Sequence, residues 1–309
     1  MIRIRVPATT ANLGPGFDCM GLALDLWNSF EMHLRGQQIV VSVSGEGENS
    51  LATDDTNLIA TTFCQELTRL ALNPPPGVQF IVHNAVPCAS GLGSSSTATL
   101  AGIMFAQAYA AFLEGKDPAD IDRNETLRRS IEVEGHGDNV APALLGGFVI
   151  VVPDESSGVL TQKVPHTKMK VVVCVPDFQY FTVDARKALP DSYSKYDAIF
   201  NIGRAMLVAE AFRSGNDELL RNAMNDRIHE PFRLKDIPGA VNVKSAALEA
   251  GALCVCLSGA GPGIVAFARE GFDRIGRAMK GAYQASGLDA RYWILDTSED
   301  GVHVGRLPV

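Results

Sequence analysis

The sequence predicts an α+β protein with two domains of similar size. Its 309 residues exceed the usual domain length of about 100–200 residues. Short segments with strand-like alternation of apolar residues occur beside longer segments with helical spacing, without the regular β–α–β alternation of a parallel sheet. Apolar residues make up 46% and charged residues 20% of the chain, which excludes a disordered protein and leaves enough material for a large core.

The first half contains four predicted strands and two predicted helices. Alternating apolar residues predict strands over 2–6, 30–34 and 78–82, and a short apolar run predicts a buried strand over 147–153. A helix is predicted over 56–72, because two aspartates precede it and three prolines end it. A second, alanine-rich helix is predicted over 95–113.

The polar, turn-rich segment 154–158 predicts the break between the two halves, which places the domains at 1–157 and 158–309. Beyond it, spacing and apolar runs predict strands over 170–175, 252–257, 264–268 and 292–295 and helices over 193–213 and 272–283. The helix 193–213 is predicted from Ile199, Ile202 and Met206, which are three and four residues apart.

Charge and cysteine content exclude several function classes. The 27 Lys and Arg against 35 Asp and Glu give a net charge of −8, which disfavours nucleic acid and anionic membranes as partners. No apolar run reaches the roughly 18 residues of a membrane span, and the charged first residues do not resemble a secretion signal. Six scattered cysteines are typical of free thiols in a reducing compartment, so we expect a cytoplasmic protein without a cysteine metal site.

The most informative segment is residues 87–96, Pro-Cys-Ala-Ser-Gly-Leu-Gly-Ser-Ser-Ser, which follows a predicted strand and opens a helix. Unpaired N–H groups and the positive end of the helix dipole favour a phosphate there, and the glycines allow close approach of the backbone. The alternative is a serine-rich cap that only stabilises the helix. The segment lacks the lysine of a Walker A loop and the third glycine of a dinucleotide-binding fingerprint.

Three segments together resemble the motifs of the GHMP kinase family, in the family's order: 7–18, 87–96 and 257–263. Two further segments, 134–143 and 185–190, are similar to motifs of the homoserine kinases within that family, as is the Asn-Leu-Gly-Pro-Gly-Phe-Asp run at 12–18. The resemblance implies an N-terminal domain like ribosomal protein S5 domain 2, a ferredoxin-like C-terminal domain, and ATP in the cleft between them. It also implies transfer of the ATP γ-phosphoryl group to the hydroxyl of L-homoserine in threonine biosynthesis, and a homodimer.

The implied substrate site fits the chemistry of an amino acid. Homoserine is a zwitterion, and arginine forks suit its carboxylate. By resemblance, Asp18 holds the ammonium group and Asp18, His136 and Asn139 act in catalysis. The residues implied in substrate binding are Asn12, Asp18, Thr182, Arg186 and Arg233. A mevalonate-type kinase would leave Asp18 without its cation, and a non-catalytic ligand sensor on the same fold is the other alternative.

The implied nucleotide site lies on the glycine-rich segments. The residues implied in ATP binding are Asn57, Pro87, Gly91, Leu92, Gly93, Ser94, Ser95, Ser96, Gly259 and Gly261. Glu134 and Ser95 are implied to hold Mg²⁺, with Glu132 as the alternative carboxylate, because this cation prefers oxygen ligands.

Two positions depart from the homoserine kinase pattern, and one role stays open. Gly137 stands where the pattern usually has proline, and Thr97 where it usually has alanine. These changes affect the expected rigidity of the loop that carries His136 and Asn139 and of the start of the helix after residue 94. Asp18 is the nearest general-base candidate, but an aspartate paired with an ammonium group is a weak base.

Overall fold

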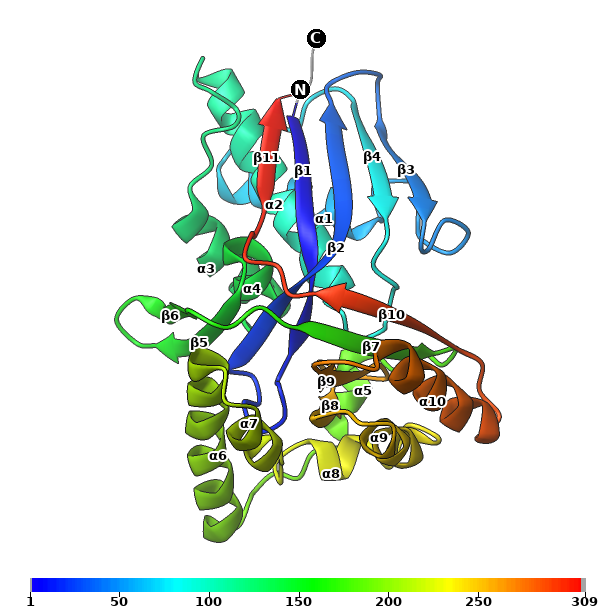
Figure 1. Ribbon diagram of the computed structural model, residues 1–309. Helices are drawn as coiled ribbons and strands as arrows, with labels where there is room; N and C mark the ends of the chain where they lie inside the picture. Colours follow the sequence, from blue (N-terminus) through cyan, green and yellow to red (C-terminus); the bar gives the residue numbers. More distant parts are fainter. Residues whose placement is uncertain (1, 307–309) are drawn as a thin grey trace.

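Two β-sheets organise the computed structural model, which describes residues 2–306 (Figure 1). The first sheet contains β1 (Ile2–Ala11), β2 (Met20–His33), β3 (Ile39–Gly45), β4 (Val78–Asn84), β5 (Phe148–Asp154), β6 (Gly158–Val164) and β11 (His303–Arg306). Its strand order is β11-β1-β2-β4-β3, and β5 pairs with β2 and β6. The second sheet has the order β10-β7-β9-β8, from β7 (Lys170–Pro176), β8 (Cys254–Leu257), β9 (Ile264–Ala268) and β10 (Ala290–Asp296).

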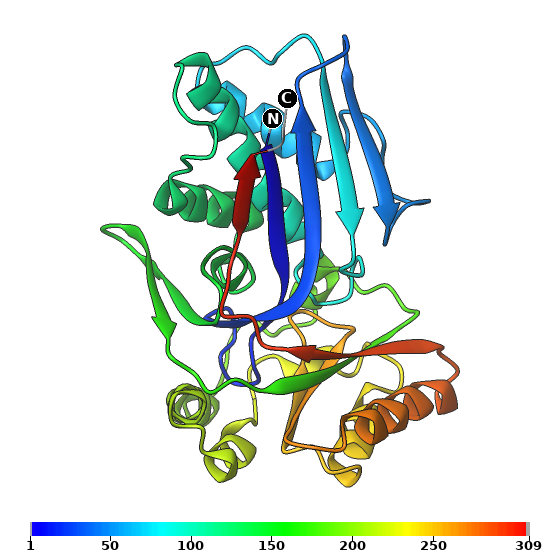
Figure 2. The ribbon, with the colours of Figure 1, turned by 45° about the horizontal axis from the view of Figure 1, so that its top comes forward.

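Ten helices cover these sheets within the described residues. They are α1 (Leu58–Arg69), α2 (Ser94–Leu113), α3 (Arg123–Glu134), α4 (Val140–Leu145), α5 (Thr182–Lys187), α6 (Lys195–Ser214), α7 (Asp217–Ala223), α8 (Glu230–Arg233), α9 (Ala240–Glu249) and α10 (Phe272–Ala285). Helices α1 to α4 lie with the first sheet, whereas α9 and α10 run beside each other against the second (Figures 1 and 2). All predicted strands and helices are present, most with ends shifted by a few residues, but β2 begins ten residues before its predicted start. Strands β3, β6 and β11 and helices α3, α4, α5, α7, α8 and α9 were not predicted.

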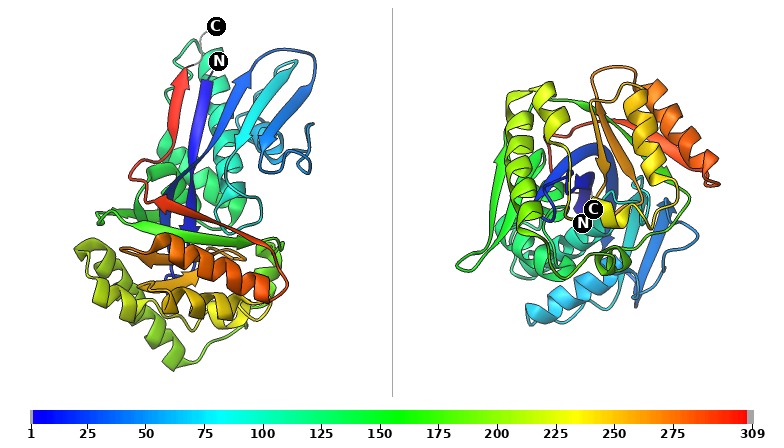
Figure 3. Two further views of the ribbon diagram at one scale, coloured as in Figure 1. Left: turned by 45° about the vertical axis from the view of Figure 1, so that its right-hand side comes forward. Right: turned by 90° about the horizontal axis from the view of Figure 1, so that it is seen from below.

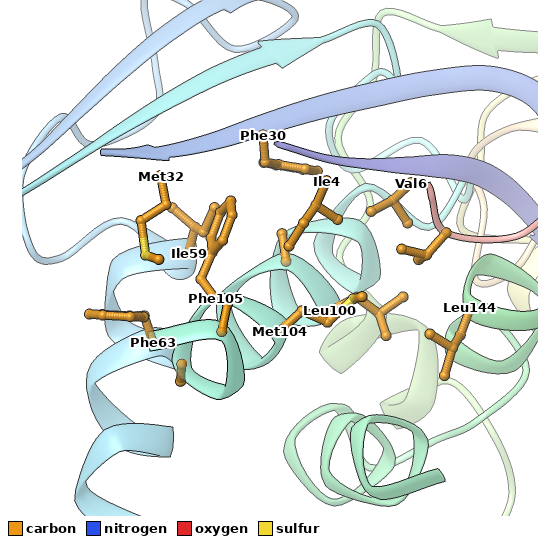
Figure 4. Close-up of a cluster of buried hydrophobic side chains, with 14 of the residues drawn as sticks. Ile4, Val6, Phe30, Met32, Ile59, Phe63, Leu100, Met104, Phe105 and Leu144 are labelled. Atoms are coloured by element: carbon orange, nitrogen blue, oxygen red, sulfur yellow. The ribbon is translucent and has the colours of Figure 1, made fainter. Parts of the chain in front are cut away.

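The first core lies between one face of the first sheet and helices α1 and α2. Ile4 and Phe30 point from β1 and β2 toward Leu100, Met104 and Phe105 on α2 (Figure 4). Alternation places the apolar residues of β1 on this face, because successive side chains of a strand point to opposite sides. Among the described residues, α2 is the one helix long and apolar enough to span a membrane, but 67% of its apolar window is buried inside the protein. It is therefore a core helix, and its N-terminus lies at the glycine–serine segment 87–96.

The turn-rich segment at 154–158 is a hairpin turn between β5 and β6. The Asp154 carboxylate accepts hydrogen bonds from the backbone N–H groups of Ser156 and Ser157, which closes the turn locally. Strand β6, beyond this turn, and β11, at the far end of the chain, both join the first sheet. The division at 157/158 stays a prediction.

Helix α6 is present as predicted, but the residues that predicted it face outward. Ile199, Ile202 and Met206 are 58%, 62% and 64% exposed. The buried face carries Val208 and Phe212, which join the core under the second sheet. Seen from below, α6 lies on the opposite side of the molecule from α9 and α10 (Figure 3).

Candidate active site

The glycine–serine segment forms the floor of a cavity of about 620 Å³. Gly93, the residue before α2, is in the left-handed conformation, and no side chain within residues 2–306 caps the helix. The first N–H groups of α2 therefore lie at the cavity without a side-chain partner. Gly91 also has a positive φ of 78°, and a Cβ atom there would lie 2.1 Å from the Ser258 carbonyl oxygen. Glycine is required at this position because it lets the two glycine-rich segments meet.

Most residues predicted to bind the nucleotide line this cavity. They are Asn57, Gly91, Gly93, Ser94, Ser95, Ser96, Gly259 and Gly261. Leu92 is fully buried in the core and offers only its backbone, and Pro87 is not part of the lining. The Asn57 side chain caps α1 through Ile59 N–H at 3.1 Å and donates to the Ala52 carbonyl at 2.6 Å, so its amide already holds the cavity wall together.

Glu134 lies beside the loop serines. Its carboxylate accepts hydrogen bonds from the hydroxyls of Ser95 at 3.2 Å, Ser96 at 3.0 Å and Thr99 at 2.6 Å. Glu132 is exposed and pairs with Arg128 and Arg129 on its own helix. The geometry therefore favours Glu134 over Glu132 as the carboxylate near a bound phosphate.

A second, smaller pocket adjoins the first and contains the predicted substrate residues. Its lining residues are Asn12, Asp18, His136, Asp138, Asn139, Thr182, Arg186, Arg233, Gly259 and Ala260. His136, Asn139, Thr182 and the glycine-rich segment border both spaces. A hydroxyl held in the small pocket would thus face the end of a triphosphate held in the large one.

Opposite charges meet in the small pocket. Arg186 donates two hydrogen bonds to the Asp18 carboxylate, at 2.9 and 3.1 Å, and this pairing raises the arginine pKa despite burial. Arg233 is only 2% exposed and forms no ion pair with a carboxylate within residues 2–306; it donates to the Ala185 carbonyl at 3.2 Å. Burial lowers the pKa of Arg233 below its usual value, and the charges of Asp18 and Asp138 offset this effect only in part.

Asn12 and Asn139 fix the loops around this pocket. Asn12 is buried, donates to the Gly259 carbonyl at 2.7 Å, and accepts from the Asp18 N–H at 2.9 Å. It therefore holds Asp18, whose φ is +54°, in an unfavourable backbone conformation. The side-chain oxygen Oδ1 of Asn139 accepts a hydrogen bond from the Thr9 hydroxyl at 2.8 Å, which directs the side-chain NH₂ group away from Thr9.

Asp138 is a site residue that sequence reasoning missed. It is 2% exposed, and its carboxylate lies 3.0 Å from His136 Nδ1. Burial lowers the pKa of His136, but the hydrogen bond and charge of Asp138 outweigh it, so the pKa lies above its usual value. The signal was available, since Asp138 stands two residues from a predicted site histidine.

The two departures from the family pattern are built into the packing. A Cβ atom at Gly137 would lie 2.7 Å from a Val151 methyl group, so this loop fits closely against β5. The Thr97 hydroxyl donates to the Ser94 carbonyl at 2.8 Å and accepts from the Asn28 amide at 2.9 Å. Thr97 therefore ties the start of α2 to β2.

Comparison with known proteins shows the family of this chain. The family model for the GHMP kinase N-terminal domain matches residues 57–147, and the model for the GHMP kinase C-terminal domain matches 208–285. A homoserine kinase from Synechococcus sp. is 38% identical over 306 residues, covering 98% of this chain and 97% of that protein. The chain belongs to the homoserine kinases of the GHMP kinase family.

Other members of this family and their structural relatives give the same fold. A homoserine kinase from Carboxydothermus hydrogenoformans is 38% identical over 94% of this chain and 92% of its own. The crystal structure of homoserine kinase from Cytophaga hutchinsonii has a TM-score of 0.82 at 29% identity, covering 98% and 96% of the two chains. Mevalonate kinase from L. major, at 15% identity and a TM-score of 0.73, shares the fold. The predicted GHMP kinase fold is confirmed.

Proposed function

We propose that this chain phosphorylates the side-chain hydroxyl of L-homoserine with ATP, giving O-phospho-L-homoserine on the route to threonine. The observation that carries the proposal is the pair of adjoining pockets: one fits a triphosphate at a helix N-terminus, and the other contains Asp18, Arg186 and Arg233. One carboxylate and two guanidinium groups match the charges of a zwitterion. Mevalonate carries a carboxylate but no ammonium group, so it would leave Asp18 without a cation from the substrate.

Substrate binding exchanges ion pairs rather than filling an open space. The small pocket encloses only about 20 Å³, less than one amino acid needs, while Asp18 and Arg186 are paired. A zwitterion replaces this pair with two others, its ammonium group with Asp18 and its carboxylate with Arg186 and Arg233. A neutral alcohol offers no such exchange, which supports selection of an amino acid.

The residues at the loop fit Mg²⁺, which we propose as the metal. Glu134 and the Ser95 hydroxyl offer oxygen ligands, and no cluster of three or more His, Cys, Asp or Glu side chains gathers within residues 2–306. One carboxylate beside phosphate oxygens is typical of Mg²⁺ sites in kinases. When bound, the ion neutralises charge on the β- and γ-phosphates.

The chain itself contributes positioning and charge complementarity. Neither pocket is lined by a lysine within the described residues, so the N–H groups at the start of α2 stabilise the phosphates. Asn139 and His136 border both spaces and hold the acceptor hydroxyl in line with the γ-phosphorus, and phosphoryl transfer depends mainly on such placement. We assign Asp18 to substrate binding, because its carboxylate already accepts hydrogen bonds from a guanidinium group in this pocket.

We also propose a cytoplasmic homodimer, formed by antiparallel pairing of α6 with its copy. Tyr196, Ile199, Ile202 and Met206 are between 58% and 81% exposed along this helix. Pairing about Ile202 and Gly203 brings Ile199 opposite the partner's Met206 and Lys195 opposite Glu210 of the partner subunit, so apolar groups meet and opposite charges align. Ile202→Lys should convert the dimer to a monomer in analytical ultracentrifugation. The control Val241→Lys changes a similarly exposed apolar residue on α9 and should leave the dimer intact. A monomeric wild type would refute this interface.

A coupled ADP-release assay tests the activity. With ATP and Mg²⁺, turnover is expected with L-homoserine and not with mevalonate, shikimate or galactose. Turnover with another of these substrates would assign the chain to a different reaction, and nucleotide binding without ADP release would indicate a ligand sensor.

A further inference from the structure

Arg233 stands on a helix of one turn that several buried groups hold in place. Asp226 accepts hydrogen bonds from the backbone N–H groups of His229 at 2.8 Å and Glu230 at 2.7 Å, which caps α8. The Glu230 carboxylate pairs with Lys244 and accepts from the Leu257 N–H. These contacts fix the backbone of α8, but they leave the direction of the Arg233 side chain to its own neighbours.

His229 is the neighbour that sets this direction. It is fully buried, and its Nε2 lies 2.9 Å from the Gly14 carbonyl oxygen. A carbonyl oxygen only accepts hydrogen bonds, so Nε2 must carry the proton. In the neutral imidazole, Nδ1 is then an acceptor, and it lies 3.4 Å from Arg233 Nη1, which donates to it.

The same imidazole connects the two oppositely charged parts of the substrate pocket. Its ring stacks on Phe17 with the centroids 5.2 Å apart, and the Arg233 guanidinium lies 5.1 Å from the centre of the Phe17 ring. Phe17 precedes Asp18 directly, and Gly14 belongs to the same β1–β2 loop. His229 thus contacts the loop that carries the anion and the arginine that supplies the cation.

We propose that His229 is a positioning residue for substrate binding: its neutral Nε2–H form links the Gly14 carbonyl to the Arg233 guanidinium and so fixes the separation between Asp18 and Arg233. This role rests on the proposed function, since that separation matters only for a zwitterionic substrate. With Nε and Nη1 held by the protein, Arg233 Nη2, which has no hydrogen bond within residues 2–306, remains for the substrate carboxylate.

Two substitutions separate the two hydrogen bonds of His229. His229→Asn keeps an acceptor near Nδ1 and loses the donor to Gly14, whereas His229→Gln keeps a donor near Nε2 and loses the acceptor for Arg233. We expect His229→Gln to raise the KM for homoserine at least tenfold and to change the KM for ATP less than twofold. His229→Asn should raise the KM for homoserine by a smaller factor. His166→Asn, which removes another histidine with a buried side chain, is the matched control and should leave both KM values unchanged.

Parallel rises in both KM values, or an unchanged homoserine KM in His229→Gln, would overturn the proposal.

¹⁵N NMR of histidine-labelled wild type, without substrate, gives a readout that needs no variant to fold. A proton on Nε2 and a hydrogen-bonded, unprotonated Nδ1 are expected, and the opposite tautomer or a doubly protonated ring at neutral pH would refute it. Failure of wild-type turnover with homoserine would instead reject the proposed function and leave this spectroscopic result standing.

Discussion

Replacing Arg233 with leucine tests most directly whether the positive charge of this residue binds the substrate carboxylate. Arg233 is 2% exposed and forms no ion pair with a carboxylate within residues 2–306, so we propose that its charge binds the substrate carboxylate. Leucine fills part of the buried space with an apolar side chain and removes the guanidinium group. The expected consequence is a specific loss of homoserine binding.

The size of this loss follows from the contacts that Arg233 offers. A hydrogen bond to a charged group contributes about 1.5–3 kcal/mol, and more is lost when the remaining charge stays buried. A loss of about 3 kcal/mol corresponds to a rise of roughly 100-fold in the KM for homoserine, since about 1.4 kcal/mol is tenfold. The free energy of unfolding should change by less than about 2 kcal/mol, because removal of a desolvated cation offsets the lost hydrogen bonds to the Ala185 carbonyl and to His229 Nδ1.

Steady-state ADP release, with homoserine and ATP varied in turn, measures the two KM values, and urea denaturation measures stability. Arg269→Leu is the matched control, because Arg269 forms an exposed ion pair with Asp217 outside both pockets. It should change neither KM. An unchanged homoserine KM in Arg233→Leu, or an equal rise for ATP, would show that Arg233 does not bind the substrate carboxylate.

Two further substitutions test the nucleotide side. Glu134→Gln keeps the side-chain shape but removes the charge, so the Mg²⁺ concentration for half-maximal ADP release should rise more than tenfold. The control Glu132→Gln should leave this concentration unchanged. Equal effects of the two substitutions would remove the preference for Glu134. Gly91→Ala forces a side chain into a left-handed position and toward the Ser258 carbonyl. It should raise the KM for ATP at least tenfold and lower the melting temperature, and an unchanged KM would contradict the role of this turn.

The sequence was sufficient for the nucleotide loop because the signal there is local. A glycine–serine run between a strand and a helix dictates its own backbone, and the cavity lies where it was predicted. The proposed substrate residues came from the resemblance to the family, since Asp18, Arg186 and Arg233 are far apart in the chain and no local pattern joins them. Helix α6 shows the limit of periodicity: the spacing of Ile199 and Ile202 fixed the helix but not which face is buried.

By itself, the sequence predicted most strands, the helices α1, α2, α6 and α10, the glycine–serine turn before α2 and the charges available for a zwitterion, because these follow from backbone preferences and side-chain chemistry. Only the tertiary structure decided that Asp18 pairs with Arg186, that Asp138 supports His136, and that His229 faces Arg233. The Asp18–Arg186 pair joins residues 168 positions apart, whereas the other two contacts join near neighbours in the chain whose side-chain directions depend on tertiary packing. Burial then sets the strength of each charge.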